Sequence, residues 1–164
     1  MKKVALVMGS KNDLPALAPC IKTLKAFGIP FEARVMSAHR TPEEAGEFSK
    51  NAAQSGFGVI IAAAGKAAHL AGAMSANSIL PVIGIPVKAS LEGLDALLPT
   101  VQMPAGIPVA TVAINGAENA AILAAQIIAL GEPALAEKLL AHKQKMRDDG
   151  AKANAALQEE IATL

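Results

Sequence analysis

Apolar residues follow two different periods along the chain as far as Leu130. Short runs rich in apolar and β-branched residues predict strands, and these runs are Val4–Met8, Phe31–Met36, Val59–Ile61, Pro81–Ile85 and Val109–Ile114. The first of them is a continuous apolar run, which is expected of a strand covered on both faces. Apolar positions three and four residues apart predict helices, and these segments are Leu14–Phe27, Glu43–Ser55, Ala67–Asn77, Leu94–Leu98 and Ala117–Leu130. The two kinds of segment alternate, which indicates parallel strands joined by helical crossovers.

The alternation predicts an α/β fold, a three-layer sandwich around a flavodoxin-like parallel five-stranded sheet in the order 2-1-3-4-5. After Gly131 the pattern changes to a long polar helix over Ala134–Leu164, in which Gly150 is the expected place of a bend. We therefore expect one domain over residues 1–164, with a core at 1–131 and a C-terminal helical extension at 132–164. The partly apolar face of the extension suits packing on the domain or on a neighbouring subunit.

The predicted strand order brings three polar turns together. It places strands two, one and three side by side, and these strands end at Ser37–Thr41, Gly9–Asp13 and Ala64–His69. In open parallel sheets, ligands bind in the crevice beyond the carboxyl ends of the strands, where the strand order reverses. We therefore expect the three turns to line one binding crevice.

The turn from Ser37 to Thr41 offers the clearest candidate chemistry. It presents a hydroxyl, the imidazole of His39 and the guanidinium of Arg40 just before a helix, for which Thr41 suits the N-cap and Pro42 the first position. A histidine titrates near neutral pH, so His39 is the acid–base candidate. The alternative interpretation of this turn alone is a well-capped helix preceded by solvated polar residues.

The other two turns indicate a phosphate and ribose site. Gly9 allows close backbone approach, Ser10 and Asn12 supply donors at the positive end of the first helix, and Asp13 can accept hydrogen bonds from ribose hydroxyls. The alternative is that these side chains only cap the helix. In the third turn Gly65 is expected to permit tight bending. Of the remaining histidines, His69 is interpreted as a structural hydrogen-bond donor inside the third helix, and His142 as a solvated side chain.

Composition and the absence of certain motifs exclude several kinds of partner and cofactor. The formal net charge of +1 gives no electrostatic footprint for nucleic acid or an anionic membrane, and no apolar run is long enough to span a bilayer. Cys20 is the only cysteine, which indicates a buried side chain and a reducing, cytoplasmic location. No metal-ligand spacing and no dinucleotide or Walker motif is present, and the absence of Trp and Tyr disfavours flavin. The residues alone predict an enzyme or binding protein for a small phosphorylated sugar compound.

Seven segments together resemble the N5-carboxyaminoimidazole ribonucleotide mutase family of purine biosynthesis. They are Gly9–Asp13, Ser37–Pro42, Ala67–Leu70, Pro81–Val87, Gly93–Leu98, Val101–Pro104 and Val109–Asn115. The resemblance implies a cytoplasmic homo-octamer of flavodoxin-like subunits that uses no metal and no cofactor. It implies a reaction that moves a carboxylate from the exocyclic N5 of an aminoimidazole ribonucleotide to ring carbon C4.

The resemblance also implies roles for individual residues. His39 would carry the proton, Ser10 and Arg40 would bind the phosphate with Asn12 beside them, and Asp13 would bind ribose hydroxyls. The residues expected around the carboxylate and the imidazole are Ser37, Gly65, Lys66, Ala67, His69 and Leu70. Gln102–Pro104 would lie near a site shared between subunits.

Three positions depart from the family pattern. Asn12 replaces a serine, Lys66 replaces a second glycine, and Leu70–Ala73 replaces Leu-Pro-Gly-Met. The last two lie in the turn expected to enclose the carboxylate, so the alternatives are a direct carboxylase that adds carbon dioxide to aminoimidazole ribonucleotide and a non-catalytic nucleotide-binding module. If the position of Lys66 needs a positive φ, lysine is strained there, and we expect either a compensating contact with substrate or a side chain turned to solvent.

Overall fold

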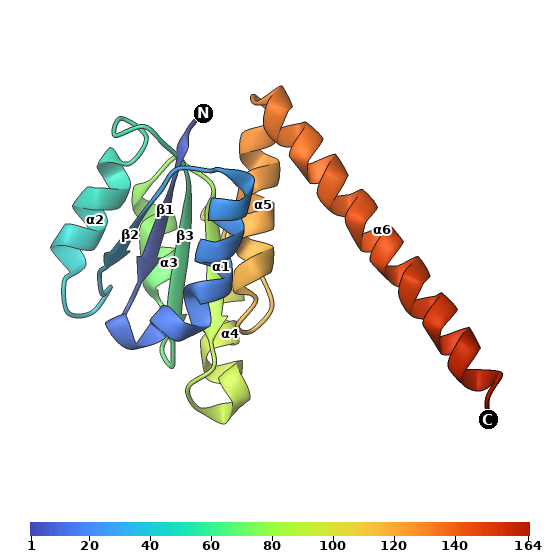
Figure 1. The fold of residues 1–164 in the computed structure, drawn as a ribbon. Coiled ribbons are helices and arrows are strands. Elements are labelled where there is room, and N and C mark those ends of the chain that lie inside the picture. The colour runs from blue at the N-terminus through green and yellow to red at the C-terminus, as the bar shows by residue number, and fades with distance from the viewer.

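The computed structural model describes residues 1–164 and contains one parallel five-stranded sheet in the predicted order, β2-β1-β3-β4-β5 (Figure 1). The strands are β1 (Lys3–Met8), β2 (Phe31–Val35), β3 (Phe57–Gly65), β4 (Val82–Val87) and β5 (Ala110–Thr111). Strand β1 lies between β2 and β3 and pairs with both of them over most of its length. The carboxyl ends of these three strands therefore meet at one edge of the sheet.

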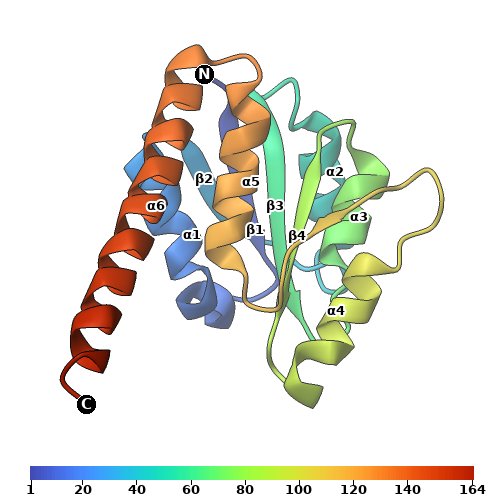
Figure 2. The ribbon, with the colours of Figure 1, turned by 90° about the vertical axis from the view of Figure 1, so that its right-hand side faces the viewer.

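Helices cover both faces of the sheet, which confirms the three-layer prediction (Figure 2). They are α1 (Leu14–Phe27), α2 (Pro42–Asn51), α3 (Leu70–Asn77), α4 (Leu94–Val101), α5 (Ala117–Ala129) and α6 (Pro133–Ile161), with short 3-10 turns η1 (Lys11–Asp13) and η2 (Leu91–Gly93). Helices α1 and α5 lie on one face of the sheet, and α2, α3 and α4 lie on the other.

The inner strands β1, β3 and β4 are buried on both sides because alternate side chains enter two separate cores, whereas the edge strands β2 and β5 contain no fully buried residue. In β1, Leu6 faces the core under α1 and α5, whereas Val7 faces the core under α2 and α3. Small residues let the helices approach closely: a Cβ at Gly84 would lie 2.4 Å from Cγ2 of Thr100 on α4. Cys20 is fully buried in the first core, as predicted, and burial raises the pKa of its thiol to about 12.

Several element boundaries differ from the prediction. Strand β3 is longer than the predicted Val59–Ile61, whereas three other elements are shorter because tight turns replace regular structure. Strand β5 has only two residues, since the chain turns at Ala113–Ala117 to begin α5. Helix α2 ends at Asn51, and the turns that follow lead to Gly56, where φ is +86°. Helix α3 begins at Leu70, because the residues from Lys66 to His69 form two successive turns instead of helix.

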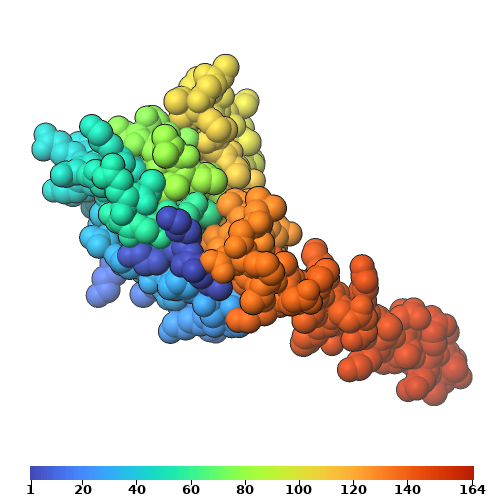
Figure 3. Space-filling model, turned by 90° about the horizontal axis from the view of Figure 1, so that it is seen from above, coloured from blue at the N-terminus to red at the C-terminus, as the bar shows by residue number.

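Helix α6 leaves the rest of the molecule as an extended arm (Figures 1 and 3). It is one helix of 29 residues that continues through Gly150, and Figure 1 shows it straight, without the bend expected there. Near its start Leu135 is buried and the Lys138 ammonium donates to the Phe27 carbonyl at 2.7 Å. The His142 ring packs edge-on against Phe27 with centroids 5.7 Å apart, so His142 is not simply solvated as predicted. No helix of the structure is both long and apolar enough to cross a membrane.

Candidate active site

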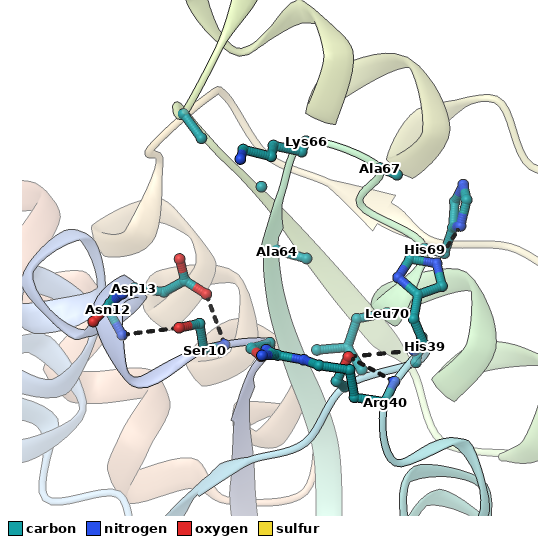
Figure 4. A pocket seen from close by; sticks show the side chains of 15 residues that line it. Ser10, Asn12, Asp13, His39, Arg40, Ala64, Lys66, Ala67, His69 and Leu70 are labelled. Carbon is teal, nitrogen blue, oxygen red and sulfur yellow. Dashed lines mark hydrogen bonds between the residues drawn. The ribbon is translucent and has the colours of Figure 1, made fainter.

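A cavity of about 690 Å³ lies beyond the carboxyl ends of β1, β2 and β3 (Figure 4). All of the residues predicted from the sequence for the site line it. They are Ser10, Asn12, Asp13, Ser37, His39, Arg40, Gly65, Lys66, Ala67, His69 and Leu70. The topology therefore joins the three polar turns at one place, while the roles of these residues in binding and catalysis stay predictions.

The turn after β1 forms one end of the cavity. The Ser10 hydroxyl accepts a hydrogen bond from the Asn12 amide at 3.2 Å, and the Asp13 carboxylate accepts one from the Ser10 amide at 3.0 Å. These reciprocal bonds form a capping box on η1, just before α1, so both side chains do cap the local structure. The carboxylate is partly buried and this raises the pKa of Asp13, although the bond from Ser10 opposes the shift.

The turn after β2 is held by its own serine and threonine. The Ser37 hydroxyl accepts from the amides of His39 and Arg40, at 3.3 and 3.1 Å. Thr41 is the N-cap residue of α2, which confirms the predicted position, but its side chain makes no capping hydrogen bond; the hydroxyl instead accepts from the Ser37 amide at 2.9 Å. Pro42 is the first residue of α2, which confirms that part of the prediction. These bonds fix the backbone that carries His39 and Arg40.

Arg40 connects the turns after β2 and β1. Its guanidinium donates to the Gly9 carbonyl at 2.9 Å. The cation therefore lies close to the amino end of η1 and α1, where backbone N–H groups and the helix dipole favour an anion. Arg40, Ser10 and these backbone groups together make this end of the cavity suited to a phosphate.

Two histidines meet at the other end of the cavity. Nε2 of His39 and Nδ1 of His69 are 2.8 Å apart, which is a hydrogen-bond distance, and the tautomers of the two rings set which nitrogen donates. The rings are nearly perpendicular, with an interplanar angle of 80°. Both side chains are exposed toward the cavity, and His69 comes immediately before α3 rather than within it. Such a pair can donate a proton to a bound substrate and later accept one back, so that the proton stays within the site.

The sequence interpretation missed the pairing of these two histidines. His39 and His69 are 30 residues apart and follow strands that are not neighbours in the sheet. One feature could have indicated the pairing: α2 and α3 cover the same face of the sheet. Because these helices pack side by side, the residues that precede them, which include His39 and His69, lie close together. Ala89, which also lines the cavity, carries no chemical signal in the sequence.

The turn after β3 contains the main departure from the family pattern. The left-handed residue is Lys66, with φ of +55°, and not the preceding glycine. Gly65 is needed for close packing instead: a Cβ there would lie 3.1 Å from the Val87 carbonyl oxygen and 3.2 Å from Cβ of Ala89. The side chain of Lys66 makes no hydrogen bond or ion pair within the chain and lines the cavity.

Two further expectations concern groups outside the cavity. Gln102–Pro104 does not line it within one chain, and Met103 packs instead beside Gly72 of α3. The predicted closeness of this segment to a shared site therefore stays a prediction. The structure has no group of three or more His, Cys, Asp or Glu side chains that could hold a metal ion.

Comparisons with known proteins point to one family. The family described as AIR carboxylase matches residues 3–149. An N5-carboxyaminoimidazole ribonucleotide mutase of Thermotoga maritima is 51% identical over 90% of this chain and 86% of its own length. Proteins of the same name from Saccharolobus solfataricus and Mycobacterium tuberculosis are 52% and 48% identical, over 91% and 95% of this chain and 95% and 90% of their own lengths.

A solved structure agrees with this assignment. The crystal structure of Treponema denticola PurE superposes with a TM-score of 0.83 at 27% sequence identity, and the match covers 94% of this chain and 97% of that one. The sequence match spans β1 to α6, and the structural match includes the parallel sheet whose carboxyl edge carries the cavity. This chain belongs to the AIR carboxylase family, and the curated relatives that it matches over most of its length are N5-carboxyaminoimidazole ribonucleotide mutases.

Proposed function

We propose that this chain is an N5-carboxyaminoimidazole ribonucleotide mutase, an isomerase of purine biosynthesis with His39 as its proton carrier. It moves the substrate carboxylate from exocyclic N5 to ring carbon C4 and gives 4-carboxy-5-aminoimidazole ribonucleotide. The observation that carries the proposal is the His39–His69 pair, at 2.8 Å, in the same cavity as a phosphate-binding arrangement. The identity of about half of all positions to relatives of that name supports the same reaction.

The end of the cavity formed by Ser10, Asp13 and Arg40, called the anchoring end below, binds the ribose phosphate. The phosphate accepts hydrogen bonds near Ser10 and Asn12 at the amino end of η1 and pairs with Arg40. The Asp13 carboxylate already accepts one backbone bond from Ser10 and has capacity left for ribose hydroxyls. With the phosphate fixed at this end, the imidazole ring extends toward His39 at the other.

The reaction needs one proton to move out and back. His39 donates a proton to N5 while the bond from N5 to the carboxyl carbon breaks, which releases carbon dioxide and leaves a neutral amine. The nucleophilic C4 then attacks carbon dioxide and forms a carbon–carbon bond. The proton on C4 returns to the His39–His69 pair, and the ring regains its aromaticity. The site must exclude water while carbon dioxide is free, because water and diffusion would otherwise divert it.

The proposal includes a homo-octamer that acts in the cytoplasm. The arm formed by α6 supports assembly, since it extends away from the rest of the chain (Figure 1) and exposes Leu140, Met146, Leu157 and Ile161 along its length. Exposed apolar surface of this kind is typical of protein interfaces. Sedimentation of the purified protein tests the assembly, and a fully active monomer that is stable to dilution would contradict it.

One assay tests the proposed reaction. The purified protein is offered N5-carboxyaminoimidazole ribonucleotide without bicarbonate, and in parallel aminoimidazole ribonucleotide with bicarbonate. We expect rapid formation of the C4-carboxylated product from the first substrate at micromolar concentrations. Efficient turnover of only the second substrate would identify a direct carboxylase, and binding without turnover of either would identify a non-catalytic module.

A further inference from the structure

Lys66 is the only residue of the cavity with strained backbone. Its φ of +55° lies in the left-handed region, and the other non-glycine residues with positive φ, which are Leu91, Glu92 and Asn115, do not line the cavity. Glycine occupies this region at no steric cost, whereas an L-residue with a Cβ does not. Strained residues persist where the surrounding structure or a function maintains them, so the presence of lysine here calls for a contact that glycine could not make.

The Lys66 ammonium has no partner within the chain. Other lysines do: Lys88, at the end of the neighbouring strand, pairs with Glu92, and Lys138 donates to a backbone carbonyl. The only carboxylate among the residues that line the cavity is that of Asp13, and its one hydrogen bond within the chain comes from the Ser10 amide. The charge of Lys66 is therefore available to a ligand of the cavity.

The direction of the side chain selects one part of that ligand. In Figure 4 the Lys66 side chain extends away from the His39–His69 pair, to the side of the view on which Asp13 lies. Arg40 lies on the other side of the cavity in the same view. Two cations therefore lie on different walls of the cavity near the anchoring end. The Arg40 guanidinium is held by its hydrogen bond to the Gly9 carbonyl, whereas the Lys66 ammonium is carried by a flexible four-carbon side chain.

We propose that Lys66 is a substrate-binding residue whose ammonium contacts the phosphate of the ribonucleotide, opposite Arg40. This inference rests on the proposed function for the identity of the substrate. The phosphate does not change during the reaction, so the contact stabilises the bound substrate and the transition state equally. Loss of such uniform binding raises KM and leaves kcat unchanged.

Three variants separate charge from backbone strain. Lys66→Met removes the charge and keeps the length of the side chain, Lys66→Gly also relieves the strain, and Lys66→Arg keeps a cation. Lys88→Met is the matched control, because it removes a lysine charge at the end of the next strand from a residue outside the cavity lining. The measurements are kcat and KM for N5-carboxyaminoimidazole ribonucleotide, the Kd of aminoimidazole ribonucleotide, which lacks the carboxylate, and the Kd of the corresponding nucleoside, which lacks the phosphate.

For both Lys66→Met and Lys66→Gly we expect KM and the nucleotide Kd to rise together by about three- to tenfold, the scale of one solvent-exposed hydrogen bond or ion pair. The kcat and the nucleoside Kd should stay near the wild-type values, Lys66→Arg should restore most of the affinity, and Lys88→Met should match the wild type. Because the contact is electrostatic and exposed, the effect should shrink as salt concentration rises.

Several results would overturn the inference. An increase of KM with an unchanged nucleotide Kd would assign Lys66 to the carboxylate, and unchanged values of both would assign it to solvent. A collapse of kcat would assign it to the chemical step. The inference and the proposed function fail separately: a wild type that binds aminoimidazole ribonucleotide but does not turn over the carboxylated substrate contradicts the function, while the nucleotide Kd of the variants still decides the role of Lys66.

Discussion

The two ends of the cavity are held in different ways. At the anchoring end, Ser10 and Asp13 bond to backbone groups within three residues of themselves, and Arg40 bonds to the Gly9 carbonyl. At the reacting end, His39 and His69 bond to each other through side-chain nitrogens, and these two residues are 30 positions apart in sequence. Local turns thus shape the first end, whereas the packing of α2 beside α3 shapes the second.

This difference separates binding from chemistry within one cavity. The anchoring end presents donors and cations that match groups of the substrate that do not react, so changes there should alter affinity. The reacting end holds the two histidines of the cavity, which are its acid–base candidates, so changes there should alter the rate at which the bound substrate reacts. Each substitution below tests whether the two ends are separable in this way.

The largest effect is expected for His39→Asn. The amide cannot carry a proton between N5 and C4, so kcat should fall by about a hundredfold or more. The Kd of aminoimidazole ribonucleotide and the assembly state should stay close to those of the wild type, because the anchoring end is intact. Steady-state kinetics and calorimetric binding measure the two quantities on the same preparation.

His142→Asn provides the matched control for this substitution. It makes the same chemical change at a histidine of α6 that packs on Phe27, outside the cavity. We expect wild-type turnover for this variant. If His39→Asn kept more than about a tenth of the wild-type kcat, His39 would not be the proton carrier.

A smaller loss of kcat is expected for His69→Leu. Removing the partner at Nε2 of His39 leaves the ring without its orienting hydrogen bond, which should lower kcat by about ten- to hundredfold. His69→Gln retains a hydrogen-bonding group and should restore part of that loss. Equal activity of the Leu variant and the wild type would show that His39 acts alone, and an effect confined to KM would place His69 in binding.

Asp13→Asn should weaken binding by about tenfold or less and leave kcat nearly unchanged, since the amide still accepts from the Ser10 amide but loses the charge. It should also change stability with pH. Because burial raises the pKa of Asp13, the wild type loses stability as pH rises through that folded pKa, whereas asparagine does not ionise.

Urea unfolding of both proteins between acid and neutral pH checks the sign of this effect. The stability of Asp13→Asn relative to the wild type should increase as pH rises through the folded pKa of Asp13 and become constant near neutrality. A relative stability that falls over the same interval would mean that the helix amino end favours the charged carboxylate more than burial opposes it.

The smallest effect is expected for the stability of Lys66→Gly. Relief of the left-handed strain, partly offset by the greater freedom of glycine in the unfolded chain, should raise the free energy of unfolding by about 0.5–1 kcal/mol. Chemical denaturation of this variant beside Lys66→Met, which keeps the strain, measures the difference. An equal stability of the two variants would indicate that the surrounding turn adapts to either residue.

Much of the fold followed from the sequence because its apolar pattern is simple. Strands such as Val4–Met8 are buried on both faces, and helix spacing is clear between them, so the sheet order could be predicted. Boundaries set by tight turns could not be predicted in the same way: apolar residues continue from Val109 to Ile114, yet only two of them join the ladder because the chain must turn at Ala113.

The candidate site also has features that could be predicted from the sequence and features that could not. Hydroxyl, amide and carboxylate groups at strand ends were visible as motifs, so each turn could be assigned to the cavity before its shape was known. The bond between His39 and His69 was not visible, since it depends on how two helices pack. Nor could sequence place the left-handed conformation at Lys66 instead of Gly65, because the close approach of Val87 and Ala89 occupies the space that a Cβ at Gly65 would need.

The central claim is that carbon dioxide released at N5 is captured at C4 inside this cavity, with the proton held by His39. The most direct test follows the carboxyl carbon itself: substrate with an isotopically labelled carbamate carbon is converted in a single turnover in the presence of excess unlabelled bicarbonate. The account predicts that nearly all of the label appears in the C4 carboxylate of the product. A product that carries carbon from the bicarbonate instead would contradict it.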